Sequence, residues 1–569
     1  MLKRILTLSL LCLILLTVSR AESAATVYHG GYIYGKTGSP QIEAVVVENG
    51  KFSYAGSLEG ALQAAGADYK RIDLQGRMML PSFFDAHAHP NLGALLDLRE
   101  LPYAGDVPTP EEYAEHIRQY LKTHPDTKVL RGVGWDNAAF PEAPPDKTLL
   151  DRVSSEIPIF IRSFDQHSAW VNSKALEMSG VTRDTPDPLG TIERDERGEP
   201  RGTLRDEATI MVDSALPPVS VAEHKELILK FQDMMHSLGV TGYMCAMVLP
   251  RDNHYTAYRE LLAEGRLLAY TRLAFMVTAN TYADAIGWAS GEAAEYEADG
   301  ANDLLGFRLI KFFMDGAIVG QTGYLLDDYA ARPGYRGEPL WPADGTKLRG
   351  AFELCEKNNL RIHIHAVGDA AVHLALDGLE AVKTPNRHAI THVELVDPAD
   401  FARFRAMGVM AAINPYWFCK SAVWADAELK QLGPERSERM LPAKSFYDAG
   451  VKVSAASDYP VTSSPDPLVG IEMAVVRTLI APWRGGRSAG ECSLNINEAI
   501  SMEQAIDAFT LSAAYAYDLD AITGGIEAGK SADFVLLDAN IFQTELPSGA
   551  KVLETWFRGE KVYHAKHAK

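Results

Sequence analysis

The sequence has little cysteine for its length. It contains five cysteines in 569 residues, and Cys12 lies in the apolar N-terminal stretch. The other four, Cys245, Cys355, Cys419 and Cys492, are far apart and lack the short paired spacing of a cysteine-ligated metal site. The chain is therefore not built on a disulfide framework or on cysteine-bound metal.

Basic residues are also in deficit. There are 55 Lys and Arg residues against 75 Asp and Glu residues, which gives a formal net charge of −20 at pH 7. A surface of this sign repels nucleic acid and anionic membranes. The composition excludes nucleic acid as a natural partner and favours a soluble protein.

The apolar run at the N-terminus is too short for an ordinary membrane span, which needs about 20 residues. It extends from Ile5 to Val18, after Lys3 and Arg4. Small residues precede Glu22, as in a secretory signal peptide. We predict that residues 1–21 are cleaved and that the protein is periplasmic or secreted, with no membrane contact afterwards. An uncleaved anchor is the alternative.

Internal repeats and low-complexity tracts are absent, and an apolar fraction of 47% allows a large core in more than one structural unit. Residues 26–80 read as short strands, and Asn49-Gly50 between two apolar runs predicts a hairpin. Residues 520–569 have the same character, and neither fragment can bury its apolar face alone. We expect one composite β-sandwich built from both ends.

Between these ends, apolar strands alternate with helical patterns such as His224–Leu238 and Ala370–Val382. The expected strands are Met79–His89, Val240–Ala246, Arg272–Thr278, Phe307–Asp315, Arg361–Val367, Ala389–Val393, Val409–Asn414 and Val451–Asp458. This alternation predicts an α/β fold with a parallel sheet, and eight strands suit a closed (β/α)8 TIM-like barrel over residues 81–519. Residues 99–221 break the rhythm after the first strand and predict an inserted subdomain.

The first barrel strand ends in His87 and His89. Side chains two apart on a strand point the same way and can converge on one ion. Four later strand-like stretches also contain residues of ligand type: Lys311, His365, His392 and Asp458. Because barrels of this type place their chemistry where strands end, the set predicts a metal site.

Five motifs carry a resemblance to a known family. They are Phe84-Asp-Ala-His-Ala-His89, Lys311-Phe-Phe-Met-Asp-Gly316, His363-Ile-His-Ala-Val-Gly-Asp369, Arg387-His-Ala-Ile-Thr-His392 and Ser457-Asp-Tyr-Pro-Val461. In this order they resemble the amidohydrolase superfamily, and within it amidohydrolase family 3, the YtcJ-like metal-dependent amidohydrolases. The resemblance also implies the composite β-sandwich. It further suggests that Trp135, Asp136, His167 and Trp170 of the insertion contact substrate, although the subdomain core is an alternative place for them.

Metal-dependent hydrolysis needs a cation that lowers the pKa of water, and histidine and carboxylate ligands suit zinc. We expect His87, His89 and Asp458 to hold one ion and His365 and His392 a second. His363 shares the face of His365 but is left out, because it could lie one layer deeper in the barrel.

Lys311 shares a strand face with Leu309 and Phe313, so burial in the barrel would favour its neutral amine. The resemblance implies that this amine is carboxylated and that the carbamate bridges two ions. A lysine paired with Asp315 or Asp458 is the alternative, and it would favour one metal.

Asp458 is the expected general base and acid. The predicted function is hydrolysis of a carbon–nitrogen amide bond in a small molecule, an acyclic amide such as an N-substituted formamide or N-acyl amine. A cyclic amide or an ester on the same site is an alternative, as is a non-catalytic periplasmic binding or regulatory protein. The sequence leaves a homo-oligomer open.

Overall fold

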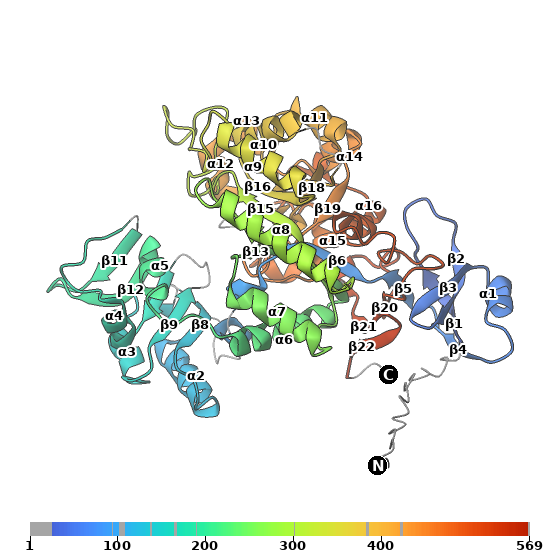
Figure 1. Ribbon diagram of the computed structural model, residues 1–569, viewed down its shortest axis with the longest axis horizontal. Helices are drawn as coiled ribbons and strands as arrows, with labels where there is room; N and C mark the ends of the chain where they lie inside the picture. Colours follow the sequence, from blue (N-terminus) through green and yellow to red (C-terminus); the bar gives the residue numbers. More distant parts are fainter. Residues whose placement is uncertain are drawn as a thin grey trace, which may run out of the picture.

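The computed structural model describes residues 25–566 apart from residues 94, 102–107, 137–138, 164–167, 189, 301, 383–385 and 422–424. In this part of the chain the strands form three sheets of eight, six and eight strands. A barrel occupies the centre, with a sheet built from both chain ends on one side and the inserted subdomain on the other (Figure 1). The predicted signal peptide lies outside the described residues.

The two chain ends pair in one sheet, with the order β22-β21-β20-β5-β1-β2-β3 and with β4 beside β1. Its elements are β1 (Ala25–Ile33), β2 (Ile42–Glu48), β3 (Lys51–Gly56), α1 (Leu58–Ala64), β4 (Tyr69–Asp73), β5 (Met78–Pro81), β20 (Phe534–Leu537), β21 (Val552–Phe557) and β22 (Glu560–His564). The predicted hairpin is confirmed, because Asn49 and Gly50 connect β2 to β3 with φ angles of 50° and 78°. These positive angles are what a two-residue hairpin turn requires.

This terminal sheet is hydrogen-bonded as one continuous sheet, and it curls so that its two ends meet. Phe52 N donates to Lys530 O at 2.9 Å, and Ala532 N donates to Gly50 O at 2.9 Å. The Phe52 and Phe534 rings therefore meet across a shared core, with centroids 6.0 Å apart. The curl buries an apolar face that neither chain end could bury alone.

The stretch Met79–His89, expected as one strand, is two strands in different sheets. It is divided between β5 of the terminal sheet and β6 (Phe83–Ala88) of the barrel. Pro81 ends the first strand, and Ser82 N donates to Asp533 O at 3.1 Å. This short connection fixes the first barrel strand directly to the terminal sheet.

The barrel prediction is confirmed in its eight parallel strands, which neighbour one another in chain order. They are β6, β13 (Val240–Val248), β14 (Tyr270–Met276), β15 (Leu305–Phe313), β16 (Arg361–Ala366), β17 (Ala389–His392), β18 (Met410–Ile413) and β19 (Val453–Ala455). The helices around and between them are α6 (Val221–Ser237), α7 (Asn253–Ala263), α8 (Tyr282–Ala298), α9 (Thr346–Lys357), α10 (Asp369–Val382), α11 (Asp400–Met407), α12 (Ala425–Leu432), α13 (Pro434–Ser437), α14 (Ala443–Asp448), α15 (Pro467–Val476), α16 (Met502–Phe509) and α17 (Leu511–Ala516).

Hydrogen bonds between the first and last strands close the barrel just beyond β6 and β19. Asp458 N donates to His87 O at 2.8 Å, and His89 N donates to Tyr459 O at 2.7 Å. The buried Asp85 carboxylate adds two bonds, accepting from Ser457 N at 2.9 Å and from the Ser457 hydroxyl. We call this set the closing seam.

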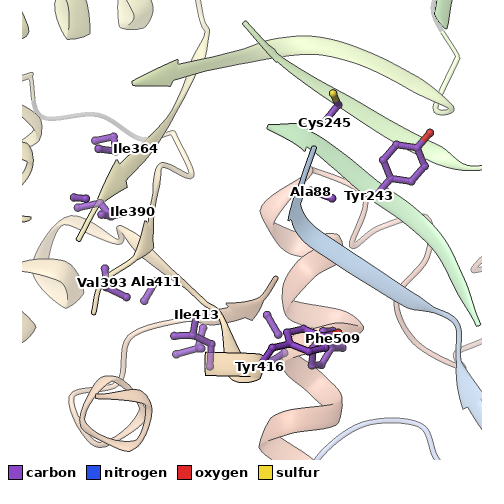
Figure 2. Close-up of a cluster of buried hydrophobic side chains, with 14 of the residues drawn as sticks. Ala88, Tyr243, Cys245, Ile364, Ile390, Val393, Ala411, Ile413, Tyr416 and Phe509 are labelled. Carbon is purple, nitrogen blue, oxygen red and sulfur yellow. The ribbon is translucent and has the colours of Figure 1, made fainter. Parts of the chain in front are cut away.

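Two apolar clusters pack against the barrel wall, one on its inner face and one on its outer face. One joins residues of non-adjacent strands, including Phe84, Leu309 and Met410, with α17, and so fills the interior. The other packs the outer face of the strands against the helices. Figure 2 shows part of it, with Ile364 from β16, Ile390 from β17 and Phe509 from α16. The interior cluster forms a floor beneath the strand ends.

The insertion after the first barrel strand is a mixed sheet with its own helices. Its elements are β7 (Leu96–Asp97), α2 (Pro110–Thr123), β8 (Leu130–Trp135), α3 (Lys147–Asp151), β9 (Ile159–Ser163), β10 (Ser168–Val171), α4 (Ser173–Ser179), β11 (Gly190–Arg194), β12 (Pro200–Asp206) and α5 (Glu207–Asp213). The four described cysteines are buried and unpaired, as their spacing predicts. Within the described residues, no helix combines the length and apolar character that a membrane crossing requires.

Candidate metal centre

The residues of ligand type gather where barrel strands end. His87 belongs to β6 and His89 follows it, while Lys311 lies in β15. His365 lies in β16 and His392 ends β17, and Asp458 follows β19. Their convergence is a consequence of the parallel barrel, which brings the carboxyl ends of all strands to one face.

His87, His89 and Asp458 meet at the closing seam, and all three are buried. Nε2 of His87 lies 3.2 Å from Nε2 of His89 and 3.3 Å from Asp458 Oδ1. Nε2 of His89 lies 3.0 Å from the same oxygen. Asp458 Oδ1 nevertheless makes no hydrogen bond with any described residue. A buried carboxylate oxygen without a hydrogen bond is costly unless a cation completes it.

His87, His365 and His392 are held as neutral donors. Burial, followed by the positive charge of Lys311, lowers the pKa of His87 well below its ordinary value. The same two causes lower the pKa of His365 to about 3. Burial and the neighbouring His365 lower the pKa of His392 in the same direction. Neutral imidazole is the form that binds a metal.

The rings of His87 and His392 each make a contact through Nδ1, which leaves Nε2 free to bind a metal. Nδ1 of His87 lies 2.8 Å from Nε2 of His363, and Nδ1 of His392 lies 3.0 Å from Asn414 Oδ1. When these Nδ1 atoms donate, Nε2 of each ring is left unprotonated. His363 thus stands behind His87, in the deeper layer considered for it from the sequence.

Lys311 is fully buried, and its Nζ lies 3.3 Å from Nε2 of His87 and 4.6 Å from the centre of the Phe313 ring. It forms no ion pair with a carboxylate of the described residues. Asp315 accepts instead from the backbone N–H groups of Tyr324, Val367 and Gly368. Burial lowers the pKa of Lys311 to about 7, against a weaker upward effect of Asp458. A large share of this amine is therefore neutral near pH 7.

His365 stands at the side of this group. Its Nε2 lies 3.1 Å from Gly316 O and 3.7 Å from Asp315 Oδ1, and its ring centre is 4.5 Å from that of His392. The ligand atoms of His87, His392 and Asp458 all lie within 4.8 Å of one another. The arrangement therefore does not separate His392 from the residues expected to hold the first ion.

These residues fit a divalent cation. Three neutral imidazoles and a carboxylate provide the nitrogen and oxygen donors that zinc and related ions prefer. The missing hydrogen bond at Asp458 Oδ1 and the unbonded, buried Nδ1 of His89 leave both groups available to further partners.

An acidic pair lies beside the histidine cluster. Glu394 follows β17 and Glu428 lies on α12, and both are buried. They share a side-chain hydrogen bond. Burial, then the charge of Glu428, raises the pKa of Glu394 well above its ordinary value. The sequence draws attention to Glu394 through its position after His392, but nothing in its local pattern identifies Glu428 as the partner.

The proposed substrate contacts are scattered in the insertion. Trp135 and Trp170 are both 0% exposed, and their Nε1 atoms donate to Ile161 O at 2.9 Å and to Asp146 O at 3.0 Å. Neither indole has surface for a substrate here, so the structure favours the subdomain-core alternative. Asp136 is exposed at the end of β8, and His167 lies outside the described residues.

The insertion reaches the barrel mouth at a different residue. The Arg99 guanidinium carbon lies 5.9 Å from the centre of the Tyr459 ring, next to Asp458. The Trp417 ring stacks on the His392 ring, with the ring centres 5.3 Å apart. The alternation of polar and apolar residues along the sequence does not identify Arg99, because this residue follows β7, a strand too short to show a pattern.

Comparison with known proteins agrees with the fold and the donor set. A sequence profile of the amidohydrolase family matches residues 70–563. The chain belongs to this family. It is accordingly a metal-dependent hydrolase that acts on carbon–nitrogen bonds.

Several proteins are similar to this amidohydrolase over most of its length. The putative amidohydrolase YtcJ of Bacillus subtilis is 27% identical over 94% of this chain and 99% of its own. The N-substituted formamide deformylase of Arthrobacter pascens is 26% identical over 87% and 90%. An uncharacterized metal-dependent hydrolase of Pyrococcus horikoshii has a TM-score of 0.73 and 22% identity, covering 92% of this chain and 99% of its own. The similarity to this last protein shows a shared fold.

We predict that Asn414→Ala weakens metal binding by about 10- to 100-fold, because the His392 ring loses the acceptor that orients it. Metal retained against increasing chelator, read by elemental analysis, measures the change. Asn386→Ala is the matched control, since Asn386 bonds Glu356 away from the centre. Unchanged affinity in Asn414→Ala would show that this amide does not position His392.

Proposed function

We propose that the protein hydrolyses an acyclic amide of a small molecule, such as an N-substituted formamide or an N-acyl amine. The observation that carries this proposal is the buried Asp458 Oδ1, which lies 3.3 Å from Nε2 of His87 and 3.0 Å from Nε2 of His89 without a hydrogen bond. The formamide substrate class is supported by the name of the similar Arthrobacter pascens enzyme.

We assign six residues to metal binding: His87, His89, Lys311, His365, His392 and Asp458. Zinc is the proposed metal, with two ions per chain when Lys311 is carboxylated and one when it is not. A bound divalent ion lowers the pKa of water toward neutrality and polarises the carbonyl of the substrate.

Asp458 moves the proton in this proposal. Its Oδ1 accepts a proton from the attacking water and then returns it to the leaving nitrogen, so one carboxylate acts as base and acid. The closing seam holds this group in place through the hydrogen bond from Asp458 N to His87 O. The Trp417 ring stacks on His392, and Tyr459 directly follows Asp458.

Other functions use the same residues differently. A cyclic amide or an ester could be attacked at the same centre, and a binding or regulatory protein could use the barrel mouth without turnover. Hydrolysis is favoured because a binding protein has no use for a carboxylate, a buried lysine and four histidines placed together. Asp136 and His167 remain proposed substrate contacts.

The purified mature protein should contain close to two divalent ions and should turn over a member of a panel of formamides, N-acyl amines and cyclic amides. Replacing both His87 and His89 with Ala should remove metal and lower turnover by about a hundredfold or more, since metal catalysis supplies several kcal/mol. His564→Ala, at an exposed position in β22, is the control. Turnover that survives the double replacement would refute the assignment, and ligand binding without turnover would favour the binding protein.

We further propose that Lys311 carries a carbamate. Carbon dioxide adds to the neutral Nζ amine, which forms a nitrogen–carbon bond and releases one proton. Burial disfavours the ammonium form, and two adjacent divalent ions would disfavour it further. The same ions favour the anionic product, which offers two oxygens as ligands.

Lys311→Ala should abolish activity and reduce metal content, and an added short carboxylic acid should partly restore both. Lys311→Arg should not restore them, because guanidinium stays protonated and cannot form a carbamate. Lys452→Arg, outside the centre, should be unaffected. Carbon-13 bicarbonate labelling followed by NMR detects the carbamate carbon. An active Lys311→Arg protein, or no such signal in active enzyme, would leave the one-metal alternative.

Export is the last part of the proposal. The apolar run from Ile5 to Val18 supports a mature chain that begins near Glu22 in the periplasm or outside the cell. The intact mass of the protein from its native host measures this directly. A chain that retains Lys3 and Arg4 would instead be tethered to the membrane.

A further inference from the structure

A second cavity lies between the inserted subdomain and the barrel. Its volume is about 730 Å³, within the range of roughly 300–1,000 Å³ of ligand pockets. Residues of β8 and β9 line one side, and the first half of α6 lines the other. Asn91 and Leu92, which follow His89, form part of its boundary, but no candidate metal ligand lines it.

One wall carries an imidazole without a hydrogen-bonding partner. His224, in the first turns of α6, lines the cavity and is only 7% exposed. Neither of its ring nitrogens hydrogen-bonds with a described residue, and Nδ1 is fully enclosed. Behind it, His254 is 1% exposed with both nitrogens unbonded, and the two ring centres are 4.9 Å apart. Nδ1 of His224 and both nitrogens of His254 are enclosed by the protein, so Nε2 of His224 is the atom of this pair that is left to meet a polar group in the cavity.

The opposite wall carries two guanidinium groups that share one carboxylate. Arg131 Nε lies 2.9 Å from Asp213 Oδ1, and Arg162 Nη2 lies 3.2 Å from Asp213 Oδ2. The two guanidinium groups and the one carboxylate together carry a net charge of +1. Several N–H groups of both side chains make no hydrogen bond with a described residue. Guanidinium is well suited to a second, bidentate carboxylate.

The remaining lining is mostly apolar and includes four further charged side chains. Leu92, Leu95, Pro218 and Val219 supply accessible apolar surface. Glu223 also lines the cavity, but its carboxylate accepts from the Ser220 N–H and hydroxyl in the helix cap. Asp126, Lys128 and Glu226 complete the charged lining.

We propose that this cavity binds a small amphipathic carboxylate, with its anionic end at Arg131 and Arg162, its apolar body on Leu92 and Pro218, and a polar contact to His224. The site is distinct from the metal centre and does not depend on the reaction proposed there. Because Asn91 and Leu92 form part of its boundary, an occupant touches the segment that directly follows His89.

Calorimetric titration of the mature protein with phenylacetate tests the proposal, with phenethylamine and 2-phenylethanol as cationic and neutral probes of similar shape. Phenylacetate should bind at one site per chain, and the other two probes should bind at least about tenfold more weakly, since a charge-assisted hydrogen bond is lost. Arg162→Gln and His224→Gln should each weaken binding by about tenfold or more. Arg183→Gln should not, because Arg183 pairs with Glu199 and does not line the cavity.

The protein with both His87 and His89 replaced by Ala separates this site from the metal centre and should bind phenylacetate as the parent does. Loss of binding in that protein would place the ligand on the metal and overturn the proposal. Binding of phenethylamine in preference to phenylacetate would also overturn it, as would no binding of any probe. Thermal unfolding of each variant confirms that a weakened titration reflects the site and not a misfolded chain.

Discussion

The candidate centre depends on the closing seam between the first and last barrel strands. Asp85 and Ser457 are 372 positions apart, yet two hydrogen bonds join them in the barrel wall. Burial raises the pKa of Asp85 to about 6, while the bonds from Ser457 and His87 oppose that shift. Without this closure, the two histidines at the end of β6 and the carboxylate after β19 would lie on opposite edges of an open sheet.

The seam brings together groups that an apolar barrel interior disfavours. Leu309 and Phe84 fill the floor, and Lys311 lies one alternate position further along β15. Desolvation shifts the buried nitrogens toward their neutral forms, as the pKa of about 7 for Lys311 and about 3 for His365 shows. Burying these polar groups lowers the stability of the fold, but it also keeps them neutral and able to bind a cation. Such a loss of stability is expected at functional sites.

Much of the barrel could be predicted from sequence because apolar strands and crossover helices alternate along the chain. Each of the eight expected strands overlaps an observed one, and the ligand-type residues follow from their positions at strand ends. The change of sheet between β5 and β6 could not be predicted, because an apolar stretch does not reveal that Pro81 ends a strand of one sheet and Phe83 begins a strand of another. Long-range partners such as Asp85 with Ser457, or His392 with Asn414, have no local sequence signal.

The groups that surround the donor set come from parts of the chain other than the strand ends. The ligand-type residues lie at strand ends, whereas Glu428, Trp417 and Arg99 come from loops, a helix and the insertion, where related proteins vary most readily. The hydrogen-bonded pair of Glu394 and Glu428 stands close to Asp458 and Asp315, whose charges further raise the pKa of Glu394. Because the raised pKa values favour a shared proton on this pair, the wall carries less negative charge than two ionised carboxylates would, and it can donate a hydrogen bond as well as accept one. The charge of the wall beside the metal centre is therefore set by the protonation of a buried pair, and not by the number of its carboxyl groups.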